Sequence, residues 1–473
     1  MHILVAGAGI TGLAGAWRLA RAGAEVTVVD PSDRIGGMLR TSLFAGRAVD
    51  EGADAFLVRT PAALALARAV GLGDVMAHPA RRNAHIWHAG SLHRLPSQVM
   101  GVPIDLDAVE ESGLLSPEGL ARLRCDLVDP PSVMPPGDVT IAEAVGSRIG
   151  AEALALLVDP LLGGINAGHT ADQSLAAVAP QLDAARRDPS HASLIEACRA
   201  QVGAARAAGI VPDAPIFAAP AGGGMARLVS AVAAAAEATG RVTLHLGAGL
   251  KVVEPGGEVV LSDGSTVSAD GVLIATPAPA AAEALAALAP DVASPLRALD
   301  HVSVAMVRLA LPAEEVGRAL DGAGMLVPRT EGLAVTACSW ASSKWAHLAP
   351  RHGDGTVIVR AAVGRDRDQA ALDLDDDALV ARVIDDLTDP LQLAGGPTEV
   401  SVHRWADAFP QFRPGHLDRV TASEDALAQL TPPVAIAGMY LRGVGIPASV
   451  TSANAAANRL LAAVAAVRPP PLA

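Results

Sequence analysis

Residues 2 to 30 combine a strand pattern, a glycine-rich turn, a helix pattern and a second strand, and no other feature constrains the fold as strongly. The first strand reads "HILVA", the turn and helix read "GAGITGLAGAWRLARAG", and the second strand reads "EVTVVD". In such a unit Gly7 makes the tight turn, Gly9 lets the backbone approach a pyrophosphate, and Gly12 lets helix and strand pack closely. Asp30 ends the second strand, where a carboxylate accepts hydrogen bonds from an adenosine ribose. The sequence therefore predicts a Rossmann-like α/β fold that binds a dinucleotide at a helix N-terminus.

Two further segments indicate which dinucleotide binds. Residues 33–41, "DRIGGMLRT", place a basic residue before a Gly-Gly pair and a threonine, which resembles the second fingerprint of the flavin amine oxidase superfamily. Residues 49–56, "VDEGADAF", resemble the D-x-G-x-x-x-F turn that runs past the flavin ring in that superfamily. An ordinary glycine turn at the end of an edge strand is the alternative for this second segment. Together the two segments favour FAD over a nicotinamide dinucleotide.

Composition limits the other functions that the chain could have. With 473 residues, two or three domains are expected, and the net charge of −14 argues against a nucleic-acid partner. No apolar run reaches the roughly 18 residues that a membrane span needs, and no basic leader precedes the first strand. The three cysteines are too widely spaced for a disulfide framework or a zinc site. We therefore expect a cytoplasmic protein without a transmembrane segment, disulfides or structural metal.

The rest of the chain alternates between helix and strand patterns. Residues 102–205 are mainly helical in pattern, and residues 241–254 predict a hairpin that ends at "SDG" (262–264). Alternating segments between about 300 and 415 predict a separate antiparallel sheet. The last unit is a strand, "VAIAG" (434–438), the glycine-rich turn "GMYLRGVGIP" (438–447) and a long helix. A second strand, glycine turn and helix predict another helix N-terminus that faces a ligand.

Taken in order, these segments resemble the protoporphyrinogen/coproporphyrinogen oxidase family, and the resemblance covers nearly the full length. The most specific motifs are "PLLGGINAG", "GAGMLVP", "SWASSKWAH", "HRWADAFPQFRPGH" and "AGMYLRGVGIP". The resemblance implies a discontinuous FAD-binding domain, a substrate domain with a mixed sheet, and a helical insertion. The FAD-binding domain is expected at 1–84, 217–289 and 432–468, the substrate domain at 85–101 and 290–431, the insertion at 102–216, and a disordered tail at 469–473.

The resemblance also implies which residues contact FAD, because both ends of the chain fold together in that family. The turn "GVGIP" (443–447) is expected against the flavin ring, Leu250 against the adenine, and Trp405 near the ring. Leu250 as a simple buried strand residue and Trp405 as a core residue are the alternatives. The full set of expected cofactor contacts is Gly7, Ala8, Gly9, Ile10, Thr11, Gly12, Asp30, Arg34, Gly37, Met38, Gly52, Ala53, Asp54, Ala55, Leu250, Trp405, Val444, Gly445 and Ile446.

A substrate with carboxylates needs cationic anchors in so acidic a chain. We expect Lys344, Arg442 and Arg40 to be the anchors, followed by Arg81 and Arg82. A solvated surface charge is the alternative for each of them, above all for Arg81 and Arg82, and a structural ion pair is a further alternative for Lys344. Departures from the family pattern concern the substrate side. They are Asn166 for a frequent tyrosine, His169 for a usual aspartate, Phe412 for tyrosine, Ser449 for a frequent cysteine, and Ala84, where membrane-bound relatives carry an arginine that clamps a propionate.

The activity that the resemblance implies is the six-electron oxidation of a porphyrinogen to a porphyrin, with oxygen as acceptor and hydrogen peroxide as second product. The sequence is most similar to the soluble branch of actinobacteria that oxidises coproporphyrinogen III in haem biosynthesis, before a transient hand-off to a ferrochelatase. Association with the membrane surface is left open. Protoporphyrinogen IX as substrate, an amine oxidase or carotenoid desaturase on the same fold, and a non-catalytic escort-type binding protein are the alternatives.

Overall fold

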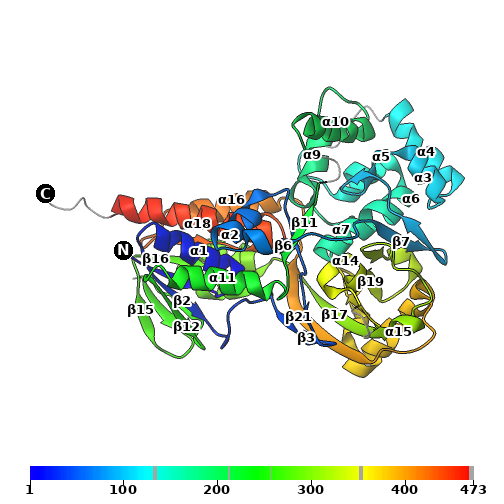
Figure 1. Cartoon of the computed structure of the whole chain (residues 1–473). Coiled ribbons are helices and arrows are strands. Elements are labelled where there is room, and N and C mark those ends of the chain that lie inside the picture. The colour runs from blue at the N-terminus through cyan, green and yellow to red at the C-terminus, as the bar shows by residue number, and fades with distance from the viewer. Residues whose placement is uncertain (131–135, 211–213, 256, 351–354, 468–473) are drawn as a thin grey trace.

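The computed structural model describes residues 1–130, 136–210, 214–255, 257–350 and 355–467. The molecule has two halves (Figure 1). One half contains both the first strand and the last helix of the chain, and the other contains a large sheet beneath a group of helices. The predicted disordered tail at 469–473 lies outside the described residues.

A five-stranded parallel sheet forms the centre of the first half. Its strand order is β12-β2-β1-β16-β22, so the chain returns to this sheet from three distant stretches. The central strand β1 is buried on both faces, as expected of a parallel sheet covered on each side. Helices α1 and α18 pack on one face. The bounds are β1 His2–Ala6, α1 Ile10–Arg21, β2 Glu25–Asp30, β12 Val242–Leu246, β16 Gly271–Ile274, β22 Val434–Ile436 and α18 Ile446–Val467.

The other face of the parallel sheet is covered by a small antiparallel sheet and two helices. This sheet has the order β13-β14-β15. The hairpin that we predicted for residues 241–254 is wrong in its pairing, because β12 runs parallel to β2 and only β13 pairs with β14. The "SDG" turn lies between β14 and β15. The bounds are β13 Leu250–Val253, β14 Glu258–Leu261, β15 Thr266–Ser268, α12 Ala278–Ala284 and α13 Pro290–Arg297.

The second half is built on a mixed seven-stranded sheet with the order β21-β17-β20-β19-β18-β7-β8. All neighbours are antiparallel except β18 and β7, which run parallel. Helix α15 packs its apolar side on one face of this sheet. The bounds are β7 Ala84–His88, β8 Ser91–Arg94, β17 His301–Pro312, β18 Gly324–Leu326, β19 Val335–Ser339, β20 Thr356–Val363, α15 Asp376–Leu391 and β21 Glu399–Pro410.

A group of helices with its own apolar core covers this second sheet at one end (Figure 1). Asp105, Ser116 and Ser193 cap three of the helices by accepting a hydrogen bond from a first-turn N–H. None of the described helices is long and apolar enough to cross a membrane. The main helices of the group are α3 Leu106–Ser112, α4 Pro117–Val128, α7 Asp159–Asn166, α9 Pro180–Arg186 and α10 Leu194–Ala207.

Short strands cross between the two halves. Strands β5, Phe56–Leu57, and β6, Met76–Ala77, both pair with β11, Phe217–Pro220. Figure 1 shows β11 and β6 between the halves, beside helix α14, Ala341–Lys344. The chain segments around β5, β6 and β11, which connect the two halves, therefore lie next to helix α14 of the second half.

Candidate cofactor and substrate site

In the N-terminal glycine turn, the packing of the protein itself requires glycine at positions 7 and 12 but not at position 9. A Cβ at Gly7 would lie 2.7 Å from the Ala275 carbonyl oxygen, and a Cβ at Gly12 would lie 1.7 Å from that of Gly7. At Gly9, the N-cap of α1, φ is −75° and a Cβ would meet nothing within 4 Å. Packing and backbone strain therefore do not require a glycine at position 9. The open space lies at the N-terminus of a 12-residue helix, so it fits a phosphate group of the cofactor.

Asp30 and the second glycine motif are adjacent to this turn. Asp30 Oδ2 accepts a hydrogen bond from the Ala8 N–H at 2.7 Å. The Gly36 N–H donates to the Ala8 carbonyl at 2.8 Å, and a Cβ at Gly37 would lie 3.5 Å from the Gly9 Cα. Both sequence motifs therefore meet at one point, as a dinucleotide site requires. The ribose contact of Asp30 stays a prediction.

The remaining predicted adenosine and pyrophosphate contacts lie close to the same turn. The Arg34 guanidinium donates to the carbonyls of Ile35 and Gly37, at 3.3 and 3.1 Å. Leu250 begins β13 and packs partly buried against the core that covers the parallel sheet. Its proposed role at the adenine stays a prediction.

The acidic turn at residues 50–54 is held by buried charges. Glu51 is almost fully buried and pairs with Arg40 at 2.8 Å and with His403 at 3.2 Å. The Trp405 indole N–H donates to the Glu51 carbonyl at 3.1 Å, and its ring lies 3.6 Å from where a Cβ at Gly52 would be. Trp405 is thus next to the turn that the sequence assigns to the flavin edge.

Asp54 is the most heavily partnered residue of this turn. Both of its carboxylate oxygens accept from the Lys344 ammonium at 3.0 Å, and Oδ2 also accepts from the Trp345 indole at 3.1 Å. The Arg360 guanidinium lies 3.0 Å from Oδ2 and donates a second hydrogen bond to the Gly52 carbonyl. Burial alone would raise the pKa of Asp54, but Lys344 and Arg360 hold it well below its usual range.

Arg360 is a residue that our sequence analysis missed. It lies in β20, in the run "TVIVRAAV", and its side chain is 3% exposed. An arginine inside a buried strand needs an anionic partner, because an unpaired charge there is very costly. From the sequence alone, a buried arginine at position 360 predicts that an anionic residue lies next to it. Only the structure shows that this residue is Asp54.

The strand order brings the C-terminal turn to the same edge of the parallel sheet as the N-terminal glycine turn, because both follow the carboxyl ends of parallel strands. Strand β22 is separated from β1 only by β16, and α17, Met439–Arg442, leads into Gly443, Val444 and Gly445. Gly443 and Gly445 have φ of +134° and +98°, and a Cβ at either would lie no closer than 3.6 Å to its neighbours. The rest of the described chain therefore does not crowd either glycine, and the backbone contacts of this turn with FAD stay predictions.

Each of the three predicted substrate anchors already faces a carboxylate. Lys344 pairs with Asp54, Arg40 with Glu51, and Arg442 with Glu424 at 2.8 Å. For Lys344, this is the structural ion pair that the sequence left as an alternative. The three cations stay candidate anchors.

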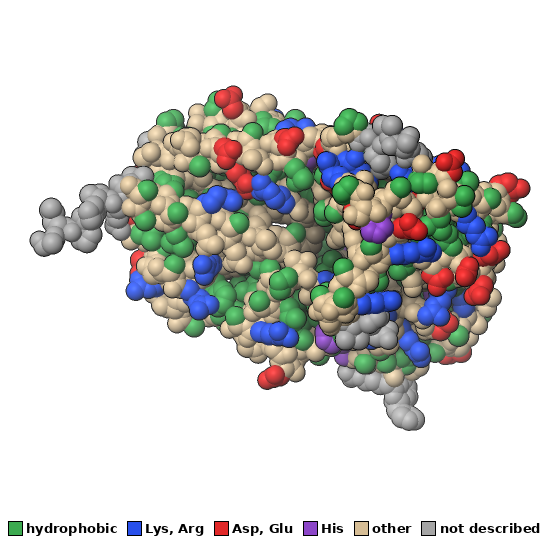
Figure 2. All heavy atoms as spheres, turned by 90° about the horizontal axis from the view of Figure 1, so that it is seen from above, with side chains coloured by type: hydrophobic (Ala, Val, Ile, Leu, Met, Phe, Trp, Pro, Cys, Tyr) green, Lys and Arg blue, Asp and Glu red, His purple; other side chains and the backbone are tan. Residues whose placement is uncertain are grey.

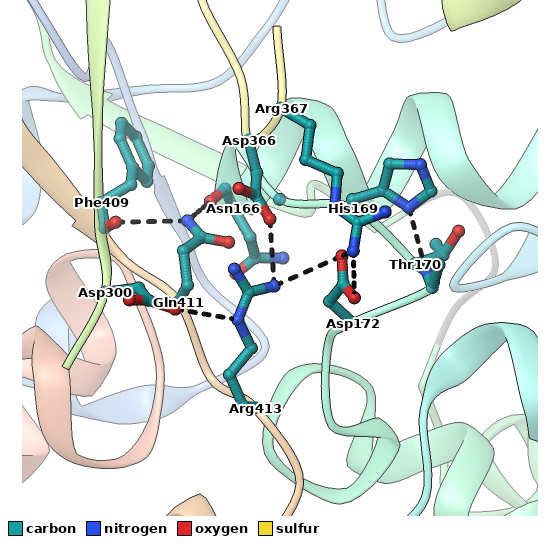
Figure 3. A network of polar contacts seen from close by, with 12 residues as sticks. Asn166, His169, Thr170, Asp172, Asp300, Asp366, Arg367, Phe409, Gln411 and Arg413 are labelled. Carbon is teal, nitrogen blue, oxygen red and sulfur yellow. Dashed lines mark hydrogen bonds and ion pairs between the residues drawn. The ribbon is translucent and has the colours of Figure 1, made fainter. Parts of the chain in front are cut away.

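Two residues that depart from the family pattern belong to a polar network that joins the helices to the second sheet (Figure 3). The Gln411 amide donates to the Asn166 carbonyl at 3.1 Å. Arg413 lies 3.0 Å from an Asp366 oxygen and 3.3 Å from an Asp300 oxygen. His169 Nδ1 accepts a hydrogen bond from the Ala171 N–H, and burial lowers its pKa. The His169 ring therefore has a structural role, whereas only the backbone carbonyl of Asn166 takes part in this network.

Comparisons with known proteins agree with this geometry. Residues 10–461 match the model of the flavin-containing amine oxidoreductase family. The chain is 36% identical over 467 residues to the coproporphyrinogen III oxidase of Mycobacterium leprae (strain TN), with 98% of each chain covered. It is 30% identical to the coproporphyrinogen III oxidase of Bacillus subtilis (strain 168), covering 97% of this chain and 98% of the relative.

The fold also matches solved structures. A crystal structure from Exiguobacterium sp. 255-15 superposes with a TM-score of 0.84 and 28% identity, and covers 97% of this chain and 98% of its own. The sequence prediction of a Rossmann-like α/β fold with a second, mixed sheet is thereby confirmed, as is FAD as the cofactor that the family implies. The chain therefore belongs to the flavin-containing amine oxidoreductase family.

Proposed function

We propose that this chain oxidises coproporphyrinogen III to coproporphyrin III, with FAD as cofactor. Three molecules of oxygen would accept six electrons and leave as three molecules of hydrogen peroxide. The observation that carries this proposal is the full-length similarity to coproporphyrinogen III oxidases, which spans 98% of both chains in the mycobacterial case. This similarity covers the cofactor half, the second sheet and the group of helices. It therefore supports the same kind of substrate site, and not only the same cofactor, as in these relatives.

Bound FAD supplies a two-electron acceptor for the hydride of a meso carbon. The chain's own contribution is to hold and orient. The N-terminus of α1 with Gly9 would hold the pyrophosphate, and Asp30 would hold the ribose. The Asp54 carboxylate, fixed by Lys344 and Arg360, keeps the backbone of the acidic turn in one position.

The indole rings of Trp345 and Trp405, beside the acidic turn, would exclude water from the reacting edge of the flavin. Trp345 is 2% exposed, and its N–H is committed to Asp54. The Trp405 N–H is committed to the Glu51 carbonyl. Because both indole N–H groups already donate hydrogen bonds within the protein, the two rings present mainly apolar surface to their surroundings.

Coproporphyrinogen III carries four carboxylates and protoporphyrinogen IX carries two, so the proposed substrate requires more cationic anchors. We favour coproporphyrinogen III because of the relatives' names, and the additional anchors remain to be identified. Passage of the product to a ferrochelatase rests on the family resemblance alone.

Aerobic turnover of the purified, FAD-loaded protein with both porphyrinogens tests the proposal. Porphyrin fluorescence and peroxide should both increase, in a ratio of three peroxides to one porphyrin, and kcat/KM should be higher for coproporphyrinogen III. A kcat/KM for protoporphyrinogen IX that equals or exceeds it would overturn the substrate assignment. A preparation that cannot be loaded with FAD would overturn the oxidase assignment as a whole.

A further inference from the structure

Where β5 pairs with β11, the sheet has one buried face and one exposed apolar face. Phe217 pairs directly with Leu57, and Ala218 pairs with Phe56. Directly opposed residues of an antiparallel pair point to the same face. Phe56 and Ala218 are buried, whereas Leu57 is 43% exposed and Phe217 is 38% exposed. The exposed face therefore consists of two large apolar side chains next to each other.

This exposed face adjoins the acidic turn. Leu57 follows Asp54 by three residues, and the Lys344 ammonium that binds Asp54 lies 5.9 Å from the centroid of the Phe217 ring. Figure 1 places β11 between the two halves of the molecule, and Figure 2 shows the surface hollowed between those halves. Large apolar side chains that are exposed beside a hollow and a cofactor turn indicate a ligand surface.

Arg81 is a cation without a carboxylate partner among the described residues, and it follows a residue whose backbone is bonded to Lys344. The Ala80 N–H donates to the Lys344 carbonyl at 2.8 Å, and Arg81 follows directly. Arg81 is exposed and makes no ion pair with any residue in the described ranges. Lys344, Arg40 and Arg442 differ from it, because each already faces a carboxylate.

We propose that Leu57 and Phe217 form the platform on which one face of the porphyrinogen ring lies, and that Arg81 binds a propionate at the edge of that ring. The substrate has an apolar ring surface and carboxylates only on its periphery, which matches an apolar platform together with an exposed guanidinium that makes no ion pair within the described residues. This inference rests on the proposed function and names the residues that recognise its substrate.

Binding of coproporphyrin III to the FAD-loaded protein, followed by porphyrin fluorescence, tests the platform without turnover. Phe217→Ala should raise the Kd about tenfold and Leu57→Ala about threefold, because each removes apolar contact with the ring. Phe217→Leu should restore most of the affinity. Leu43→Ala is the matched control, because Leu43 is 77% exposed on a different hairpin, and its Kd should equal that of the wild type.

Each variant should keep its flavin absorbance and its Tm, and in turnover the platform variants should raise KM while kcat stays within about twofold. A wild-type Kd in the Phe217→Ala variant with its flavin bound would overturn the platform. Failure of the wild type to oxidise either porphyrinogen would instead overturn the proposed function. These two failures are therefore distinguishable.

Arg81 has its own test. Arg81→Gln should raise the Kd of coproporphyrin III at least threefold more than that of protoporphyrin IX, which has fewer carboxylates (about 0.6 kcal/mol or more). Arg206→Gln is the control, because Arg206 is an exposed arginine on α10. A Kd of coproporphyrin III in the Arg81 variant that equals that of the Arg206 control would remove Arg81 from the site and leave the platform standing.

Discussion

The turn at residues 443–445 and the turn at residues 50–54 both border the predicted flavin position, yet they are built differently. The C-terminal turn has two glycines with positive φ, and a Cβ at either would approach only nearby side-chain carbons. In the acidic turn Glu51 and Asp54 are bound by two arginines, a lysine and a histidine. Glu51 and Arg360 are buried, and the other charges except Arg40 are partly buried. One turn contains glycines without side chains, and the other is held by charged partners that come mostly from distant parts of the chain.

This difference predicts two kinds of failure. A side chain added to an open glycine turn occupies space that the protein does not need for its own packing, so the fold survives and the cofactor is lost. Removal of a charge from the acidic turn leaves its partners buried and unpaired, so stability is lost first. The following variants distinguish loss of the cofactor from loss of stability.

Asp54→Asn should have the largest effect on stability. It leaves Lys344 and Arg360 without their shared carboxylate, and breaking a buried ion pair costs about 3–5 kcal/mol. Urea unfolding of the FAD-free protein measures this loss. Asp376→Asn is the control, because its pair with Arg404 is largely exposed and should cost less than about 1 kcal/mol. Equal losses in the two variants would show that the Asp54 cluster is not a buried clamp.

Gly12→Ala and Gly9→Ala form a matched pair three residues apart. Gly12→Ala forces a Cβ against the Gly7 carbonyl and should cost about 1–3 kcal/mol or more in the FAD-free protein. Gly9→Ala meets no protein atom within 4 Å and should cost less, about 1 kcal/mol for a weaker N-cap. FAD titration should nevertheless show weakened binding for Gly9→Ala. Normal affinity there would place the pyrophosphate elsewhere.

Gly445→Val should abolish FAD retention and leave a folded protein. Gly445 has φ of +98°, so part of any loss in Tm will be backbone strain. Gly90→Val controls for that strain, because Gly90 has φ of +74° with nothing within 4 Å in the turn between β7 and β8. Flavin absorbance should be lost in the first variant and retained in the second. Normal flavin content in Gly445→Val would mean that this turn does not contact the cofactor.

The sequence predicted the cofactor half better than the acidic turn, for a physical reason. The first strand–turn–helix unit is local, so Gly7, Gly12 and Asp30 could be assigned from spacing alone. The residues around Asp54 come from α14 and β20, about 290 and 306 positions later in the chain, and no local pattern joins them. The pairing of β12 was mistaken for the same reason, because the choice between a hairpin and a crossover depends on a partner strand more than 200 residues away.

The low pKa of Asp54 predicts a specific loss of stability in acid. A carboxylate whose folded pKa lies below its ordinary value of 3.8 contributes stability above about pH 4, and this contribution is lost as the pH falls toward the folded pKa. The free energy of unfolding of the wild type should therefore fall more steeply below pH 4 than that of Asp54→Asn. Urea unfolding at several pH values between about 3 and 6 measures the two slopes. Parallel slopes would contradict an ionised, paired Asp54.

The smallest expected effect is that of Arg442→Gln on substrate preference. A charge-assisted contact with a carboxylate is worth about 1.5–3 kcal/mol when it is shielded from water. Arg442 is 46% exposed and already pairs with Glu424, which also binds Arg459. A substrate propionate would have to displace Glu424 in partly solvated surroundings, which reduces the gain to a few tenths of a kcal/mol. The ratio of kcat/KM between coproporphyrinogen III and protoporphyrinogen IX should therefore change less than about threefold. A larger change would make Arg442 a true anchor, and would mean that the substrate separates the pair that the free protein forms.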